Sequence, residues 1–133
     1  MNLRMVFSPS TIAMESALHA QWQRLRTISS NIANADTPGF QARRISFENE
    51  LAREIDLIRG GGVSRREAST RLSNVVGQEY RIEGMPVRAD GNNVSLINEQ
   101  IELARIQDQY RALRQRITNH YSGLDNVIRG GRQ

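Results

Sequence analysis

The sequence predicts a mainly α-helical protein in which long N- and C-terminal helices pair as an antiparallel, coiled-coil-like hairpin around a short irregular middle segment. Two observations predict this fold. Apolar residues recur at spacings of three and four near the N-terminus, and a heptad repeat runs through the last third of the chain. With 133 residues, of which 38% are hydrophobic and 5% aromatic, the chain has the length of one domain but few large core residues.

The first long helix is predicted over residues 10–34. Ser8 provides a capping side chain and Pro9 suits the first helical turn. The apolar positions that follow form one stripe, which no Gly or Pro interrupts: Met14, Leu18, Trp22, Leu25, Ile28 and Ile32. We expect the single tryptophan of the chain to be a half-buried packing residue of this stripe.

The second long helix is predicted over residues 95–128, with Ser95 as its cap and Gly130-Gly131 as its stop. Both apolar heptad positions are filled over more than four heptads, with Glu99 and His120 as the exceptions. We expect its seam to pack against Leu18, Leu25, Ile28 and Ile32 of the first helix, through Leu96, Leu103, Ile106, Tyr110, Leu113, Ile117, Leu124 and Val127. One such seam buries too little apolar surface to offset the entropy of ordering both helices, so the pattern indicates a subunit that needs helical neighbours.

The middle of the chain lacks a sustained period. A short helix is predicted over 47–59, closed by three glycines at 60–62, and a short hairpin near Gln78–Val87. Residues 90–93 have the composition of a turn. The expected organisation is a single domain with an N-terminal helix (1–34), a turn and irregular segment (35–93) and a heptad helix (94–133).

The residues that carry most enzyme chemistry are scarce or isolated. There is no cysteine, and each of the two histidines stands alone in its predicted helix. The acidic residues around position 50 are interleaved with arginine, as on a solvated helix face. The sequence therefore predicts no catalytic site, no metal, no cofactor and no small-molecule ligand.

The charge pattern does not favour a nucleic-acid surface. All 18 basic residues are arginines, and the formal net charge is +4. Acidic residues dilute the arginines along the whole chain, whereas a nucleic-acid footprint is a concentrated basic patch.

One stretch of small and amide residues, SSNIANADTPGF, ends the first predicted helix. Asn34 can bond the last helical carbonyls, and it tolerates the left-handed conformation of a helix end. Thr37-Pro38-Gly39-Phe40 is predicted to form a type II turn with a positive φ at Gly39. These residues alone are compatible with a simple chain reversal or with an assembly joint.

SNIANADTPGF resembles the N-terminal signature of the flagellar rod and hook proteins, in which a first helix ends in S-N-I/L-A-N-x-x-T-x-G-Y/F. QARRISFENEL, DGNNVSLINEQIELARIQDQYRAL and YSGLDNVIRG are similar to later segments of the short, proximal rod members. The similar stretches occur in the expected order and cover both predicted helices. Phe40 stands where tyrosine is commoner, Ser95 stands where an acidic cap is usual, and residues 60–88 have no match.

The resemblance implies two sets of functional residues. An assembly motif comprises Ser30, Asn31, Ile32, Ala33, Asn34, Asp36, Thr37, Pro38, Gly39 and Phe40. A second family motif comprises Asp90, Gly91, Asn92, Asn93 and Val94.

The resemblance also implies a function: a non-enzymatic subunit of the bacterial flagellar basal-body proximal rod, a helical tube that transmits torque and passes exported subunits. The implied partners are other copies of the chain, FlgC-like and other rod proteins, the rod-base adaptor FliE and the type III export gate. Family members reach the periplasmic rod without a cleaved signal peptide. The start, MNLRMVF, lacks the apolar run of such a signal, and no stretch has the roughly 20 apolar residues of a membrane span.

Two other interpretations stay open at this point. A cytoplasmic coiled-coil adaptor would dimerise through the same heptads. An arginine-rich nucleic-acid-binding protein would bind with an affinity that falls steeply as salt rises.

Overall fold

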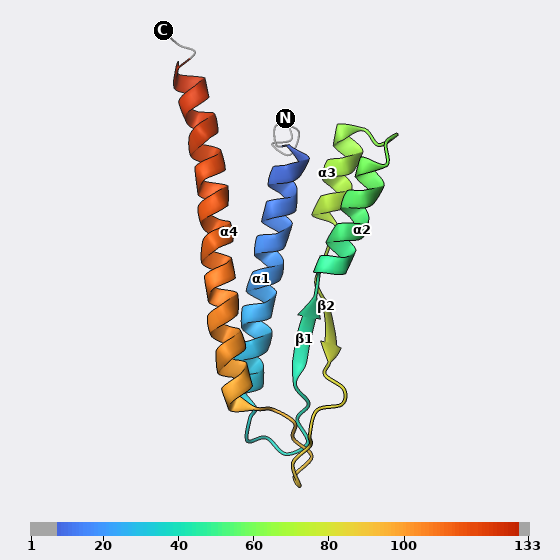
Figure 1. Ribbon diagram of the computed structural model, residues 1–133, viewed down its shortest axis with the longest axis vertical. Coiled ribbons are helices and arrows are strands. Elements are labelled where there is room, and N and C mark those ends of the chain that lie inside the picture. The colour runs from blue at the N-terminus through green and yellow to red at the C-terminus, as the bar shows by residue number, and fades with distance from the viewer. Residues whose placement is uncertain (1–7, 131–133) are drawn as a thin grey trace.

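The computed structural model describes residues 8–130 and has a mainly helical fold, as predicted. Its elements are α1 (Pro9–Ala33), β1 (Arg43–Ser46), α2 (Glu48–Arg59), α3 (Arg65–Ser73), β2 (Gln78–Arg81) and α4 (Leu96–Gly130). In Figure 1 the long helices α1 and α4 stand side by side, and the short helices α2 and α3 lie beside α1. The β1–β2 ribbon and the loops lie toward the base of the molecule, where α1 ends and α4 begins. Within the described residues, no helix is long and apolar enough to cross a membrane.

Helix α1 is capped at both ends as the sequence predicts. The Ser8 side chain accepts a hydrogen bond from the backbone N–H of Thr11, and Pro9 occupies the first turn. Asn34 follows the helix with φ −104° and does not adopt the left-handed conformation that asparagine tolerates. Its side chain donates to the Ser30 carbonyl at 2.8 Å, which satisfies one of the carbonyls left over at the helix end, as the sequence predicts.

The two long helices run antiparallel. Near one end Thr11 Oγ1 lies 2.8 Å from His120 Nε2, which explains one of the two polar exceptions in the heptad repeat. Gln21 donates to Gln109 farther along the pair. The predicted pairing of the terminal helices is therefore confirmed.

The predicted seam varies in burial along its length. Ile28 and Ile106 are buried, and the other seam residues between positions 103 and 117 are half-buried, as are Leu18, Leu25 and Ile32. Leu96 and Leu124 are each 44% exposed, contrary to expectation. At the Leu124 end the reason is length: α4 has 35 residues and α1 has 25, and α4 continues past the beginning of α1 there. The side chain of Val127 lies outside the described residues.

Trp22 is 45% exposed, so its predicted role in the packed stripe is wrong. Its ring stacks with the ring of His19 on the helix surface, and the Arg26 guanidinium lies 4.8 Å from its centroid.

A second buried face of α1 packs against the middle segment. Ala20 forms a small core with Phe47 and Val75, flanked by Ala17 and Leu51. Small residues on this face allow the α2–α3 pair to approach α1 closely, and α1 therefore has packing partners on both sides.

The middle segment is more regular than predicted. The short helix over 47–59 is confirmed as α2, with Gly60 after it. Helix α3 is new, although Ser64 and Glu67 carry the spacing of a capping box, and the Ser64 side chain accepts from the Glu67 backbone N–H. The hairpin predicted near Gln78–Val87 is wrong, because β2 pairs antiparallel with the distant β1.

Helix α4 extends farther than predicted, because its last residue is Gly130, which was expected to stop it. Gly131 lies outside the described residues.

Gly77 offers a test of the packing between the ribbon and α1. A Cβ at this position would lie 2.5 Å from Ile45 Cγ2 and 2.6 Å from Gln23 Oε1. Gly77→Ala should therefore lower the free energy of unfolding by about 1–3 kcal/mol in urea denaturation. The matched control is Gly123→Ala in α4, where a Cβ meets nothing within 4 Å and helix propensity should add about 0.5–1 kcal/mol. Equal effects of the two substitutions would contradict this packing.

Candidate functional site: a joint between two distant motifs

The residues after α1 form a tight turn, as the sequence predicts. The Phe40 backbone N–H donates to the Thr37 carbonyl at 3.2 Å, which closes a four-residue turn. Gly39, the third residue of this turn, has φ +72°, the left-handed conformation that a type II turn needs there. Together with the preceding helix end, the turn redirects the chain toward β1.

The second motif forms another turn just before α4. The Asp90 carboxylate accepts a hydrogen bond from the backbone N–H of Asn92 at 3.0 Å, and it forms an ion pair with the Arg88 guanidinium. The Asn92 N–H, aided by Arg88, holds the pKa of the Asp90 carboxyl below its ordinary value. The carboxylate thus stabilises the turn in its ionised form.

Asn92 locks the two turns together. It is fully buried, and its side-chain amide nitrogen donates to the carbonyls of Asn34 at 2.9 Å and Thr37 at 2.8 Å. Its side-chain oxygen accepts from the Val94 N–H at 2.7 Å. A second link runs between backbones, from the Gly39 N–H to the Asp90 carbonyl at 2.8 Å. One side chain therefore ties the end of α1 to the start of α4.

Asn93 connects this joint to the ribbon. Its side-chain oxygen accepts from the Ala42 N–H at 2.6 Å, and its amide nitrogen donates to the Ile82 carbonyl at 3.3 Å. The side chain thus bridges the two chain segments just beyond the β1–β2 ladder. Its backbone N–H donates to the Phe40 carbonyl at 3.3 Å.

The two turns approach so closely that glycine is required at one of the contacts. A Cβ on Gly91 would lie 3.3 Å from Gly39 Cα, and Gly91 itself has φ +81°. Apolar side chains fill the space beside the amides: Ala35, Ala42 and Val94 are buried, with Phe40 and Ile82 packed against them.

A buried ion pair lies one helical turn above the joint. Glu99 is 1% exposed, and both of its carboxylate oxygens accept from the Arg44 guanidinium, at 2.9 and 2.6 Å. Asn31 donates to the same carboxylate at 2.9 Å. The Asn31 side chain also donates to the Arg43 carbonyl of β1 and accepts from the Arg43 N–H. Glu99, the other polar exception in the heptads, thus joins α1, β1 and α4.

The structure separates the predicted motif residues into two groups. Asn31, Asn92, Asn93 and Val94 are buried, and Ile32, Asn34, Phe40 and Gly91 are half-buried. The exposed group comprises Ser30, Ala33, Asp36, Thr37, Pro38, Gly39 and Asp90. Arg44 and Glu99 belong to the same network but were not predicted; the only signal for them was an acidic residue at a seam position.

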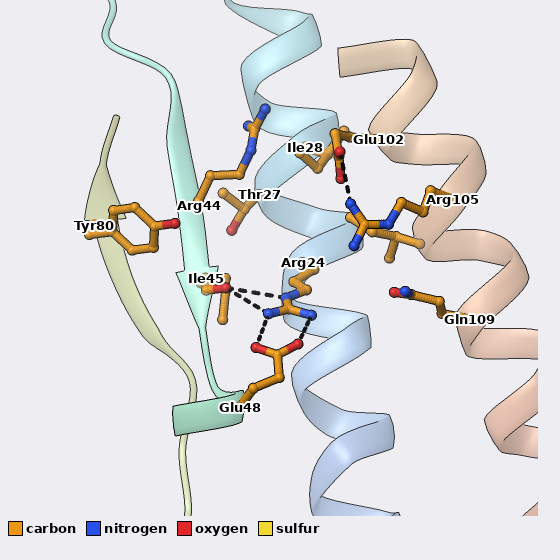
Figure 2. Close-up of a pocket in the computed structure, with 11 residues that line it drawn as sticks. Arg24, Thr27, Ile28, Arg44, Ile45, Glu48, Tyr80, Glu102, Arg105 and Gln109 are labelled. Atoms are coloured by element: carbon orange, nitrogen blue, oxygen red, sulfur yellow. Dashed lines mark hydrogen bonds and ion pairs between the residues drawn. The ribbon is translucent and has the colours of Figure 1, made fainter. Parts of the chain in front are cut away.

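The cavity in Figure 2, of about 170 Å³, lies beside this network on the side away from the joint, between α1, the ribbon and α4. Arg24, on one wall, forms two bonds to the Glu48 carboxylate and also bonds the Ile45 carbonyl. This guanidinium lowers the pKa of Glu48. The other two arginines of the lining are paired as well, Arg44 with Glu99 and Arg105 with Glu102. The Arg24 pair therefore ties α1 to α2 and the Arg44 pair ties β1 to α4, whereas the Arg105 pair lies within α4.

The fold and the joint define a mainly helical protein whose long terminal helices are tied together at one end, and comparison with known proteins shows its family. Residues 13–41, most of α1 and the turn after it, match the family described as flagella basal body rod protein. Flagellar basal body rod protein FlgB of Salmonella typhimurium is 34% identical over 128 residues, covering 88% of this chain and 91% of that protein. The protein of the same name from Escherichia coli is 31% identical with the same coverage, and that from Bacillus subtilis is 29% identical over 96% of this chain and 98% of its own.

The chain belongs to the FlgB family of flagellar basal body rod proteins. It is a structural subunit of the basal-body rod, where it assembles with other rod components. The resemblance found in the sequence is confirmed, and the adaptor and nucleic-acid interpretations are set aside.

Asn92 provides the sharpest test of the joint. Asn92→Asp keeps the shape of the side chain but replaces a donor that serves two carbonyls with a negatively charged oxygen. Both carbonyls lose their partner in a buried site, so the free energy of unfolding should fall by about 2–4 kcal/mol, measured by urea denaturation at neutral pH. Asn98→Asp is the matched control, because Asn98 is exposed in the first turn of α4 and should be close to neutral. A similar small effect of both changes would show that Asn92 does not hold the joint.

Proposed function

We propose that the joint fixes how the helix pair and the middle segment are held relative to each other in the rod, and that the helix faces beyond it carry the contacts between subunits. The observation that carries this proposal is the closure of two motifs, some fifty residues apart, around the buried Asn92 side chain. Because the amide has satisfied both carbonyls, the two turns can change their relative position only by breaking buried hydrogen bonds.

The exposed apolar residues of α4 support a role in contacts between subunits. Ile97 and Ile101 are 71% and 61% exposed, and they lie one helical turn apart close to the joint. Leu96 and Leu124, each 44% exposed, add apolar surface at the two ends of α4. Neighbouring helices in a tube would bury this surface.

The proposed partners are other copies of this chain, FlgC-like and other neighbouring rod proteins, the rod-base adaptor FliE and the flagellar type III export gate. We further propose that the chain is exported without a cleaved signal peptide into the periplasmic part of the rod. The assembled tube would transmit torque and pass exported subunits.

A non-catalytic role is part of the same proposal. Four buried polar side chains form hydrogen bonds with other parts of the chain: Asn31, Asn92, Asn93 and Glu99. A catalytic group needs a bond that it can exchange with a substrate, and these groups are committed to holding elements together.

Leu113 tests the helix seam. It is half-buried between α4 and α1, whereas its neighbour Ala112 is exposed. Leu113→Asp would place a charge in an apolar seam, at a cost of several kcal/mol, and should abolish swimming in a strain that carries only this variant. Ala112→Asp is the control for the added charge and should support swimming in soft agar. If both variants are made in normal amounts and both swim normally, the seam does not carry assembly.

Gly39 tests the turn. A Cβ here meets nothing within 4 Å, so the cost of substitution comes from the positive φ and not from crowding. Gly39→Val should add roughly 1–2 kcal/mol of strain, leave export intact and fail to build a rod, whereas Gly39→Asn should be milder because asparagine accepts this conformation. Export and motility assays on the two variants distinguish a failure of export from a failure of rod assembly.

Indistinguishable defects of Val and Asn would mean that Gly39 serves close packing between subunits. Loss of export in both variants would identify the turn as a secretion signal. Normal flagella in both variants would show that assembly does not depend on the joint.

A further inference from the structure

The two edges of the β ribbon differ. The outer edge of β1 is closed by side chains of α1: Asn31 bonds both backbone groups of Arg43, and Arg24 donates to the Ile45 carbonyl at 3.2 and 3.1 Å. No further strand can add there without displacing these bonds.

The outer edge of β2 is open. The Ile82 N–H donates to the Ala42 carbonyl, so in the alternation of an antiparallel pair residues 78 and 80 point their backbone groups toward β1. The backbone N–H and carbonyl groups of Glu79 and Arg81 therefore point away from it, and no described residue bonds them. All four residues of β2 are exposed, and Tyr80 is 50% exposed. Such an edge is a template for another strand.

The charges on this edge are unbalanced within one subunit. Arg81 stands directly opposite Arg43, an arrangement of like charges that weakens a strand pair. Glu79 compensates Arg43 across the ribbon at 3.0 Å, whereas Arg81 has no ion pair with any residue from 8 to 130. The edge therefore has room for a second carboxylate beside Arg81.

We propose that a second copy of this chain adds its β2 antiparallel to this edge, with Tyr80 facing Tyr80 of the second copy. In this register each outward-pointing residue forms a hydrogen-bonded pair, Glu79 with Arg81 of the other copy and Arg81 with Glu79. The four-stranded sheet that results has the order β1-β2-β2-β1. Each Arg81 gains the carboxylate that its own chain does not supply.

The neighbouring registers are excluded by charge. A shift of two residues in one direction pairs Glu79 with Glu79. A shift in the other direction pairs Arg81 with Arg81 and Glu79 with Glu83. Like charges directly across a strand pair are destabilising, so the sequence Glu-Tyr-Arg selects one register.

This contact is two-fold and closes on itself. A closed pair cannot propagate along a tube, so the contact belongs to the subunit outside the rod and opens when the subunit joins it. The inference rests on strand geometry and charge, and it is independent of the proposed function of the joint.

Disulfide trapping tests the geometry, because the natural chain has no cysteine. Tyr80→Cys would face itself across a non-hydrogen-bonded pair, where Cα atoms are about 4.5 Å apart and a disulfide can form. Gln78→Cys is the matched control: the side chain is exposed on the same face of the same strand, but it would face Ile82 of the second copy. Mild oxidation of the purified chain should cross-link the first variant at least tenfold faster. Equal rates, or no cross-link in either, would overturn the proposal.

Charge reversal tests the register by sedimentation equilibrium. Arg81→Glu should weaken the dimer about tenfold or more, because two carboxylates then face each other at both pairs. Adding Glu79→Arg to the same chain restores opposite charges and should bring the dissociation constant back to within about threefold of the original. A dissociation constant that neither change affects would overturn the register, as would a double variant that dimerises no better than Arg81→Glu. It would also be overturned if the original chain stays monomeric at a protein concentration 100-fold above that of the trapping experiment.

Discussion

The buried amide of Asn92 is the constraint on which the rest of the structure depends. Helices α1 and α4 are separated by more than sixty residues of chain. For their apolar seam to match, the end of α1 must lie at a defined position along the start of α4. The Asn92 side chain sets that position, because it bonds the carbonyls of Asn34 and Thr37 just after α1 and the N–H of Val94 just before α4. Any displacement of one helix along the other leaves buried polar groups without partners, which costs more than the bonds contribute when formed. Asn93 extends the same constraint to the ribbon.

The Arg44–Glu99 pair adds a second fixed point. A buried ion pair contributes little net stability, because both charges lose their hydration, yet breaking it is costly. A polar residue at a seam position of a coiled coil commonly fixes register in this way. Here Asn31 shares the carboxylate with Arg44, so the registers of α1, β1 and α4 are set together. Leucine at position 99 would remove this selection while leaving an apolar seam intact.

The sequence predicted those features that depend on neighbours along the chain. Both long helices, the cap at Ser8 and the positive φ at Gly39 follow from local spacing and residue chemistry, and all are present. Helix α3 was overlooked because it has only two buried residues, too few for a visible period, although its capping box was readable.

The missed features depend on contacts between distant segments. The pairing of β1 with β2 joins residues more than thirty positions apart, and two four-residue strands give no periodic signal for it. The second buried face of α1 is built around Ala17 and Ala20, small residues that hydrophobicity patterns pass over. The motif residues of the joint were found through their resemblance to a family, but that Asn92 would reach Asn34 and Thr37 could not be derived from either turn alone.

Amide hydrogen exchange of the isolated subunit tests the central claim most directly. If the joint holds the molecule together, the N–H groups of Gly39, Ala42 and Asn93, which bond across it, should exchange more slowly than those in the first turns of α1 and the last turns of α4. The long helices should open from their far ends, where α4 extends past α1 and neighbours in the rod are missing. Exchange at the three joint amides that is as fast as at those distal turns would contradict the account, because the helix pair would then be held by its seam and not by the amides at its base.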